Sequence, residues 1–167
     1  SLPAPRFIAR VKAAGAKVLS SATTVAEARW LAEHGCHAII AQGAEAGGHR
    51  GMFLTRDVAA QVGTMALVPQ IVDAVKLPVI AAGGVADARG ILASLALGAS
   101  GVQIGTAYLP CPETTISATW RKALAETRDD ASVLTNVFSG RPARGMRNRL
   151  IDELGPILYD NRLSGDD

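Results

Sequence analysis

Four short apolar segments without polar alternation constrain the fold of this chain more than any other feature. They are AKVLSS (16–21), CHAIIAQ (36–42), LPVIAAGG (77–84) and GVQIGTAYL (101–109). Apolar residues at helical spacing fill the stretches between them, TTVAEARWLAEHG (23–35), TMALVPQIVDAV (64–75) and ADARGILASLALGA (86–99). Such alternation is typical of parallel βαβ units with both faces of the sheet covered. The sequence therefore predicts an α/β fold built on a parallel sheet.

Local signals set the expected ends of the helices. Thr23 or Thr24 can cap the first helix, and Gly35 ends it. Pro69 lies inside the apolar pattern of the second helix. Because proline lacks an N–H group, we expect Pro69 either in the first turn of that helix or at a break in it.

A change of pattern after Pro110 and Pro112 divides the chain into a βα segment, residues 1–109, and a helical lid segment, residues 110–167. In the second segment we expect a helix over 113–130, then a loop and a basic helix within 136–157. Four parallel strands cannot close a barrel, and their outer edges would be exposed. The sheet is therefore either open or completed by four further strands. The absence of an initiator Met favours strands that lie upstream.

Composition excludes several functional classes. A formal net charge of +2 gives no argument for nucleic acid as a partner, and no apolar run is long enough for a membrane span. Cys36 and Cys111 have no metal-binding spacing, so no metal site is expected. Two unpaired thiols are typical of a reduced, cytoplasmic protein.

Glycines follow two neighbouring strands and indicate an anion site. AAGG (81–84) precedes a helix that begins near Asp87, and IGT (104–106) repeats the arrangement one strand later. Bare amide groups at such strand ends, together with a helix N-terminus, bind phosphate in many α/β proteins. The spacing does not fit GxGxxG, which disfavours a Rossmann dinucleotide site. The alternative is that these glycines only terminate strands.

His49 lies in the glycine-rich loop AQGAEAGGHRG (41–51), at the same sheet edge as the expected phosphate site. Imidazole accepts or donates a proton at neutral pH, so His49 is a candidate base. The alternative is a histidine that only hydrogen-bonds the loop. Glu45 can orient the ring or cap a backbone N–H, and a solvated loop carboxylate is an equal alternative. Gln42 can hydrogen-bond a planar heterocycle.

The remaining histidines and the basic tail are expected to have structural roles. His34 and His37 lie at the opposite edge of the sheet, at a helix end and a strand start. The arginines of GRPARGMRNR can bind an anionic substrate, but the stronger interpretation is a solvated surface; they are Arg141, Arg144, Arg147 and Arg149.

Three stretches together resemble the nitronate monooxygenase family, formerly the 2-nitropropane dioxygenases. They are AQGAEAGGHRG, the segment from LVPQIVDAV to QIGTAYL, and FSGRPARGMRNRL. The resemblance implies the C-terminal half of an FMN-dependent TIM-type (β/α)8 barrel with a small helical lid. It also implies an enzyme that oxidises alkyl nitronates, or nitroalkanes, with molecular oxygen to a carbonyl compound and nitrite.

The resemblance also implies roles for individual residues. His49 would act as the base towards a nitroalkane or position the nitronate. The FMN phosphate would contact Gly83, Gly84, Gly105 and Thr106. Gln42 and Ser21 would line the flavin, although position 21 is lysine in some relatives.

The resemblance implies a partner and leaves other functions open. The missing N-terminal half of the barrel is expected in the same or a separate chain, and homo-oligomerisation stays open. An FMN-dependent enoyl-acyl carrier protein reductase is the first alternative function. A non-catalytic flavin- or phosphate-binding module, or an inert fragment, is the second.

Overall fold

A four-stranded parallel sheet forms the centre of the computed structural model, which describes residues 2–156. Its strands are β1 (Leu19–Ala22), β2 (Ala38–Gln42), β4 (Val79–Ala82) and β5 (Gly101–Gln103). They lie in the order β1-β2-β4-β5, and each neighbouring pair is parallel. The parallel sheet expected from the four apolar segments is therefore confirmed.

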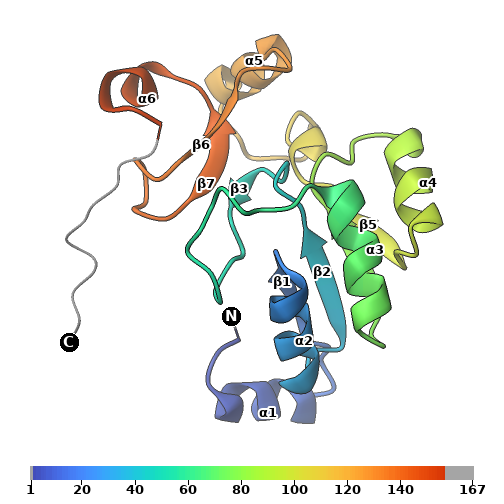
Figure 1. The fold of residues 1–167 in the computed structure, drawn as a ribbon. Coiled ribbons are helices and arrows are strands. Elements are labelled where there is room, and N and C mark those ends of the chain that lie inside the picture. Colours follow the sequence, from blue (N-terminus) through green and yellow to red (C-terminus); the bar gives the residue numbers. More distant parts are fainter. Residues whose placement is uncertain (1, 157–167) are drawn as a thin grey trace, which may run out of the picture.

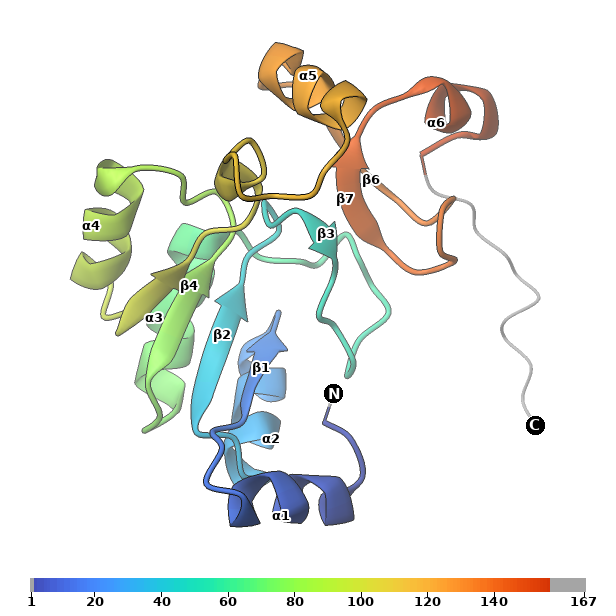
Figure 2. The same ribbon diagram turned by 180° about the vertical axis from the view of Figure 1, so that it is seen from behind.

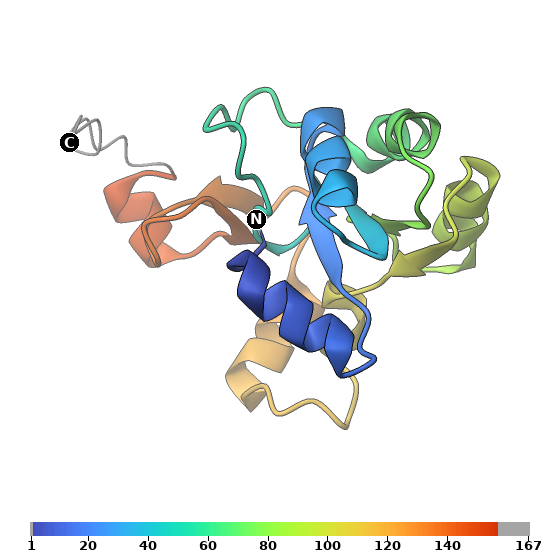
Figure 3. The same cartoon turned by 90° about the horizontal axis from the view of Figure 1, so that it is seen from below.

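Three helices pack along one face of this sheet (Figures 1 and 3). They are α2 (Val25–Glu33), α3 (Thr64–Ala74) and α4 (Ala88–Ala96). The core between the sheet and these helices includes fully buried Leu31, Ile39 and Ile71. Ile40 and Ile80 point to the other face of their strands and are only half-buried. Within residues 2–156, helices thus cover only one face of the sheet and not both, contrary to the expectation. This arrangement fits part of a barrel, because the inner face of a barrel is covered by the side chains of its other strands.

Helix α3 continues through Pro69, contrary to the expectation of a first-turn position or a break. A proline at this place removes the hydrogen bond that its own amide would donate to the Met65 carbonyl oxygen, and its ring crowds the same carbonyl group. Leu67, Val68 and Ile71 of the same helix are buried. Their burial offsets the lost hydrogen bond and keeps the helix intact.

Helix α1 (Pro5–Ala13) lies at the amino ends of the parallel strands (Figure 2). Pro5 occupies its first position, where no intrahelical N–H bond is lost. No helix was expected from the sequence over these residues.

A second, three-stranded antiparallel sheet lies beyond the carboxyl ends of the parallel strands (Figures 1 and 2). Its order is β3 (Gly48–His49), β7 (Ala143–Met146) and β6 (Ser132–Thr135). The 3₁₀ turn η1 (Thr106–Tyr108) and the helices α5 (Ala118–Glu126) and α6 (Arg149–Leu154) complete the described chain.

The two C-terminal strands correct the expectation of a purely helical second segment. Residues 143–146, expected in a loop before the basic helix, form β7, because they pair on one side with β6 and on the other with β3, far upstream. Residues 157–167, the end of the predicted lid segment, lie outside the described residues. Within residues 2–156, no helix has the length and apolar character needed to cross a membrane.

Candidate functional site

All seven residues predicted for the site lie at or beyond the carboxyl edge of the parallel sheet. Two are in strands of this sheet: Ser21 in β1 and Gln42 at the end of β2. The glycine pair Gly83–Gly84 follows β4, and Gly105–Thr106 follows β5. Because these strands are neighbours and run parallel, their carboxyl ends form one edge (Figure 2). His49, in β3, lies just beyond this edge.

The side chain of Gln42 hydrogen-bonds the main chain at the far end of the loop that follows β2. Its Nε2 donates to the His49 carbonyl oxygen at 3.1 Å, and its Oε1 accepts from the Gly51 amide at 2.6 Å. A Cβ atom added to Gly51 would lie 2.8 Å from Ser21 Cβ, so β1 packs directly against this loop. Ser21, Gln42 and the chain around His49 therefore form one contiguous group.

Arg50 anchors the same loop from within, although the sequence analysis did not single it out. Its guanidinium donates to the carbonyl oxygens of Gly43 at 2.8 Å and Gln42 at 3.0 Å, and to Gln61 Oε1 at 3.0 Å. The residue is 8% exposed, and burial, followed by the nearby charge of Arg144, lowers the pKa of Arg50. The sequence signal that could have identified Arg50 is its long, charged side chain in a loop that otherwise consists mostly of small residues.

His49 is held by the C-terminal part of the chain. It pairs with Ala143 of β7, and the Arg50 amide donates to the Pro142 carbonyl oxygen at 2.9 Å. The imidazole is exposed, and its Nε2 lies 2.8 Å from Ser139 Oγ. Ser139 was not predicted, because nothing in sequence spacing connects it to His49.

The basic tail divides into one anchoring residue and several surface residues. Arg144 is half-buried, and its Nε donates to the Ala44 carbonyl oxygen at 3.0 Å. Arg147 and Arg149 form exposed ion pairs with Asp152 and Glu153. Arg144 thus fixes the loop next to the candidate site, whereas Arg147 and Arg149 have the solvated role expected from the sequence.

The glycines expected to bind phosphate lie where three loops meet. Gly83 has φ +115°, and a Cβ atom there would lie 2.9 Å from both the Ala46 amide nitrogen and Thr64 Oγ1. A Cβ atom on Gly47 would lie 2.8 Å from Thr106 Oγ1. The loops after β2, β4 and β5 therefore approach one another closely at this edge.

Free amide donors remain at this junction. The amides of Gly84, Gly105 and Thr106 have no hydrogen-bond acceptor within residues 2–156. All three residues are exposed, and free amides of exposed residues at adjacent strand ends suit a phosphate group. The residues present therefore fit the phosphate of a flavin mononucleotide.

The N-terminus of α4 contributes less to this anion site than the sequence suggested. Helix α4 begins at Ala88, as expected, but the Asp87 carboxylate accepts from the amides of Arg89 and Gly90. Asp87 also pairs with the Arg89 guanidinium, which together with those amides lowers the pKa of Asp87. Its carboxylate thus already complements the positive end of the helix.

Of the roles expected for Glu45, the structure shows the cap of a backbone N–H. Its carboxylate accepts from the Thr64 amide at 2.9 Å and from Thr64 Oγ1 at 3.0 Å, at the start of α3. Thr64 Oγ1 also lies 2.8 Å from the Gly83 carbonyl oxygen. Glu45 and Thr64 therefore connect the His49 loop to the glycines after β4.

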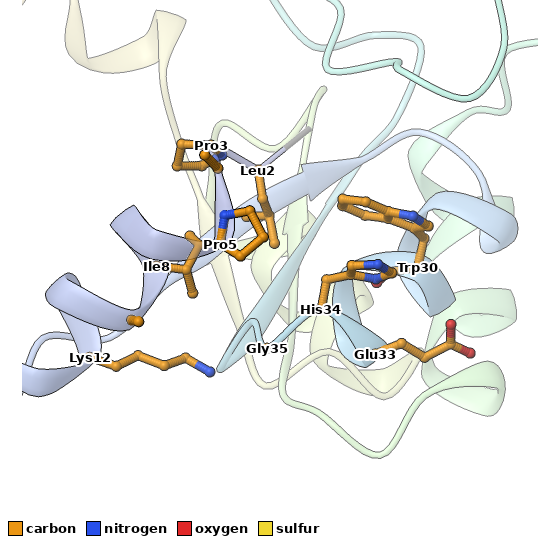
Figure 4. Close-up of a pocket in the computed structure, with 11 residues that line it drawn as sticks. Leu2, Pro3, Pro5, Ile8, Lys12, Trp30, Glu33, His34 and Gly35 are labelled. Atoms are coloured by element: carbon orange, nitrogen blue, oxygen red, sulfur yellow. The ribbon is translucent and has the colours of Figure 1, made fainter.

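A separate cavity of about 650 Å³ lies at the other end of the sheet, between α1 and the end of α2 (Figure 4). There the rings of His34 and Trp30 stack with centroids 3.9 Å apart. Nearby, His37 Nδ1 accepts from the Val18 amide at 2.9 Å. His34 and His37 thus both make contacts within the chain, as expected of structural residues, and this cavity is not part of the candidate site.

The two glycines after β4 are expected to respond differently to alanine. Gly83→Ala should lower the free energy of unfolding by about 2 kcal/mol, because its φ is strained for alanine and the new Cβ would meet a backbone atom. Gly84→Ala is the matched control, since its φ of +69° and a nearest contact of 3.4 Å predict a loss of only about 1 kcal/mol. Urea unfolding monitored by circular dichroism measures both losses. Equal losses would contradict the close approach at Gly83.

Comparison with known proteins identifies the family. The family model described as nitronate monooxygenase matches residues 1–162. This chain belongs to the nitronate monooxygenase family. A probable nitronate monooxygenase of Staphylococcus aureus (strain Newman) is 49% identical over 160 residues, which cover 95% of this chain and 45% of that protein.

Solved structures agree with this assignment. The match to nitroalkane oxidase from Streptomyces ansochromogenes has a TM-score of 0.86 at 42% identity. It covers 92% of this chain and 45% of the oxidase chain. The match to FabK from Thermotoga maritima has a TM-score of 0.79 at 33% identity. It covers 92% of this chain and 46% of the FabK chain. These neighbours are TIM barrels, so the predicted fold class, part of a (β/α)8 barrel, is confirmed. The chain spans a little under half the length of these relatives of the nitronate monooxygenase family.

Proposed function

We propose that the protein that carries these residues is an FMN-dependent enzyme that oxidises alkyl nitronates with molecular oxygen to a carbonyl compound and nitrite. One observation carries the proposal: an exposed histidine and a set of free amide donors lie together at the carboxyl edge of a parallel sheet. Membership of the nitronate monooxygenase family supplies the reaction type.

The flavin phosphate is assigned to the amides of the glycine junction, with Gly83, Gly84, Gly105 and Thr106 as its contacts. Gly83 and Gly84 allow the backbone to approach the phosphate without side chains in the way. Ser21 and Gln42 lie at the same edge and would line the flavin ring. When bound, FMN supplies the electron acceptor and the reaction with oxygen.

His49 is assigned as the catalytic residue. Its exposed imidazole can remove a proton from a neutral nitroalkane or hold a nitronate by hydrogen bonding. Gln42 and Arg50 hold the main chain at His49 and directly after it, so the ring is presented from an anchored loop. A positioned base of this kind contributes to catalysis without moving during the reaction.

The outer strands support the proposal of further strands in the active protein. No strand of the described chain pairs with the outer edge of β1 or β5. Leu19 of β1 is 46% exposed. We propose that an N-terminal half of the barrel, in the same or a separate chain, covers these edges and completes the flavin site. Homo-oligomerisation stays open.

The division of the chain and the compartment are also proposals. Residues 1–109 would form the second half of the flavin-binding barrel, and 110–167 would form a lid over its carboxyl edge. Cys36 and Cys111 are both free thiols, which supports a reducing, cytoplasmic environment.

An absorption spectrum followed by addition of propionate 3-nitronate in air tests the proposed function. A flavin spectrum, with oxygen uptake and nitrite release, is the expected result. Flavin reduction by NADH with turnover of a crotonyl thioester, and no nitrite, would indicate the reductase instead. Bound flavin without either reaction would indicate a non-catalytic binding module.

A further inference from the structure

Ser139 contacts the imidazole of His49 from the turn that connects β6 to β7. Its hydroxyl oxygen lies 2.8 Å from His49 Nε2, although the residues are 90 positions apart. The same oxygen lies 3.3 Å from the Arg141 carbonyl oxygen and 3.4 Å from the Arg141 amide nitrogen. Because a hydroxyl has one proton and two lone pairs, these three contacts limit how the protons can be arranged.

Main-chain hydrogen bonds fix both sides of this contact. His49 pairs with Ala143, and the Arg50 amide donates to Pro142. The turn itself is closed by the Gly140 amide, which donates to the Asn136 carbonyl oxygen at 2.8 Å, with Gly140 at φ +70°. Backbone hydrogen bonds therefore hold the two chain segments that carry Ser139 and His49 next to each other.

We propose that Ser139 is a positioning residue that keeps the proton of neutral His49 on Nε2 and leaves Nδ1 as the proton-accepting atom. In this arrangement Nε2–H and the Arg141 amide both donate to Ser139 Oγ, and the Ser139 hydroxyl donates to the Arg141 carbonyl oxygen. Both lone pairs and the single proton of the hydroxyl then have a partner. In the other tautomer the hydroxyl would donate to Nε2, and the Arg141 carbonyl oxygen would lose this donor.

The atom left free by this arrangement is accessible. His49 is exposed, and its Nδ1 has no hydrogen-bond partner in the chain from residue 2 to residue 156. Nδ1 can therefore accept a proton from a small molecule without first breaking a hydrogen bond to the protein.

The inference rests on the proposed function, in which His49 acts on a neutral nitroalkane. The proton leaves the carbon next to the nitro group for Nδ1, and the electron pair of the C–H bond moves into the nitro group to give the nitronate. The resulting imidazolium still donates from Nε2 to Ser139 Oγ, so the same contact stabilises the charged form. A nitronate supplied as such does not need this step.

Nuclear magnetic resonance of histidine ¹⁵N in the whole protein tests the tautomer directly. Long-range ¹H–¹⁵N correlations should place the proton of neutral His49 on Nε2 in the wild type and in Ser139→Thr, which keeps the hydroxyl. Ser139→Ala should give a mixture of tautomers. Ser132→Ala is the matched control, because this serine of the same sheet contacts Arg144 and not His49. A proton on Nδ1 in the wild type, or no change in Ser139→Ala, would overturn the proposal.

Steady-state kinetics with the flavin-loaded protein separates positioning from a structural role. Ser139→Ala should lower kcat roughly tenfold for a neutral nitroalkane, with Ser139→Thr restoring most of it, and should change kcat for the nitronate by less than about twofold. Equal losses with both substrates would show a structural role and contradict the inference. If the wild type oxidises neither substrate, the proposed function fails, while the resonance measurement still decides the tautomer.

Discussion

His49→Ala is expected to lower turnover of a neutral nitroalkane by roughly 100-fold or more in the flavin-loaded protein, the usual contribution of a positioned general base. Turnover of a preformed nitronate should fall less, because that substrate has already lost its proton. The fold should be preserved, since the imidazole is exposed and, within residues 2–156, hydrogen-bonds only Ser139. Oxygen uptake and nitrite release with the two substrates measure the effect.

His34→Ala is the matched control for this prediction. It removes another exposed histidine, at the end of α2 near the opposite edge of the sheet, where the ring stacks on Trp30. We expect turnover by His34→Ala to match that of the wild type. Full activity of His49→Ala towards the nitroalkane, with normal FMN binding, would remove His49 from the proposed reaction.

Glu27→Gln is expected to lower the free energy of unfolding by about 3 kcal/mol at neutral pH. Glu27 is fully buried, and its carboxylate accepts from the Thr23 amide and hydroxyl, both at 2.7 Å, and from the amides of Phe53 and Leu54 at 2.5 and 3.0 Å. A glutamine would present an NH₂ group to one of these pairs of donors and leave buried N–H groups unsatisfied. Urea unfolding measures the loss.

The pH dependence of this loss follows from the lowered pKa of Glu27. Burial raises the pKa of the carboxyl group, but the hydrogen bonds from Leu54, Phe53 and Thr23 outweigh it and bring the pKa below its ordinary value of 4.5. A carboxyl group with a lowered folded-state pKa stabilises the protein fully above its unfolded-state pKa, and this stabilisation is lost as the pH falls through the folded-state value. The difference between wild type and Glu27→Gln should therefore shrink below about pH 4.

Glu33→Gln provides the matched control on the same helix. Glu33 is exposed at the last turn of α2, so its replacement should change stability by less than about 0.5 kcal/mol at any pH. A loss in Glu27→Gln no larger than that of Glu33→Gln would show that the buried carboxylate does not hold the loop at Phe53 and Leu54.

Residues close together in the sequence made the fold predictable. Apolar runs such as AIIA in β2 and VIAA in β4 identified buried parallel strands, because such strands need apolar side chains on both faces. Thr24 was correctly one of two N-cap candidates for α2, since a capping side chain acts within three residues. Glycines at the ends of β4 and β5 located the candidate site, because parallel strands bring their carboxyl ends to one edge.

Short polar strands were not predictable in the same way. Residues 143–146, ARGM, have no apolar alternation, and they form β7 because two distant segments offer backbone partners on both sides. Pro69 remains inside α3 because its neighbours in the helix are buried, which is a property of the tertiary packing and not of the local sequence.

The sequence by itself determined the parallel βα order, the edge at which the candidate site lies, and His49 as its candidate base. Only the tertiary structure placed Ser139 next to His49 and the amides of Phe53 and Leu54 next to Glu27. The physical reason is the separation in sequence between the residues that interact. Helix caps and the apolar pattern of buried strands depend on neighbours along the chain. The partner of a side chain in a loop depends on which distant segments the topology brings within hydrogen-bond distance.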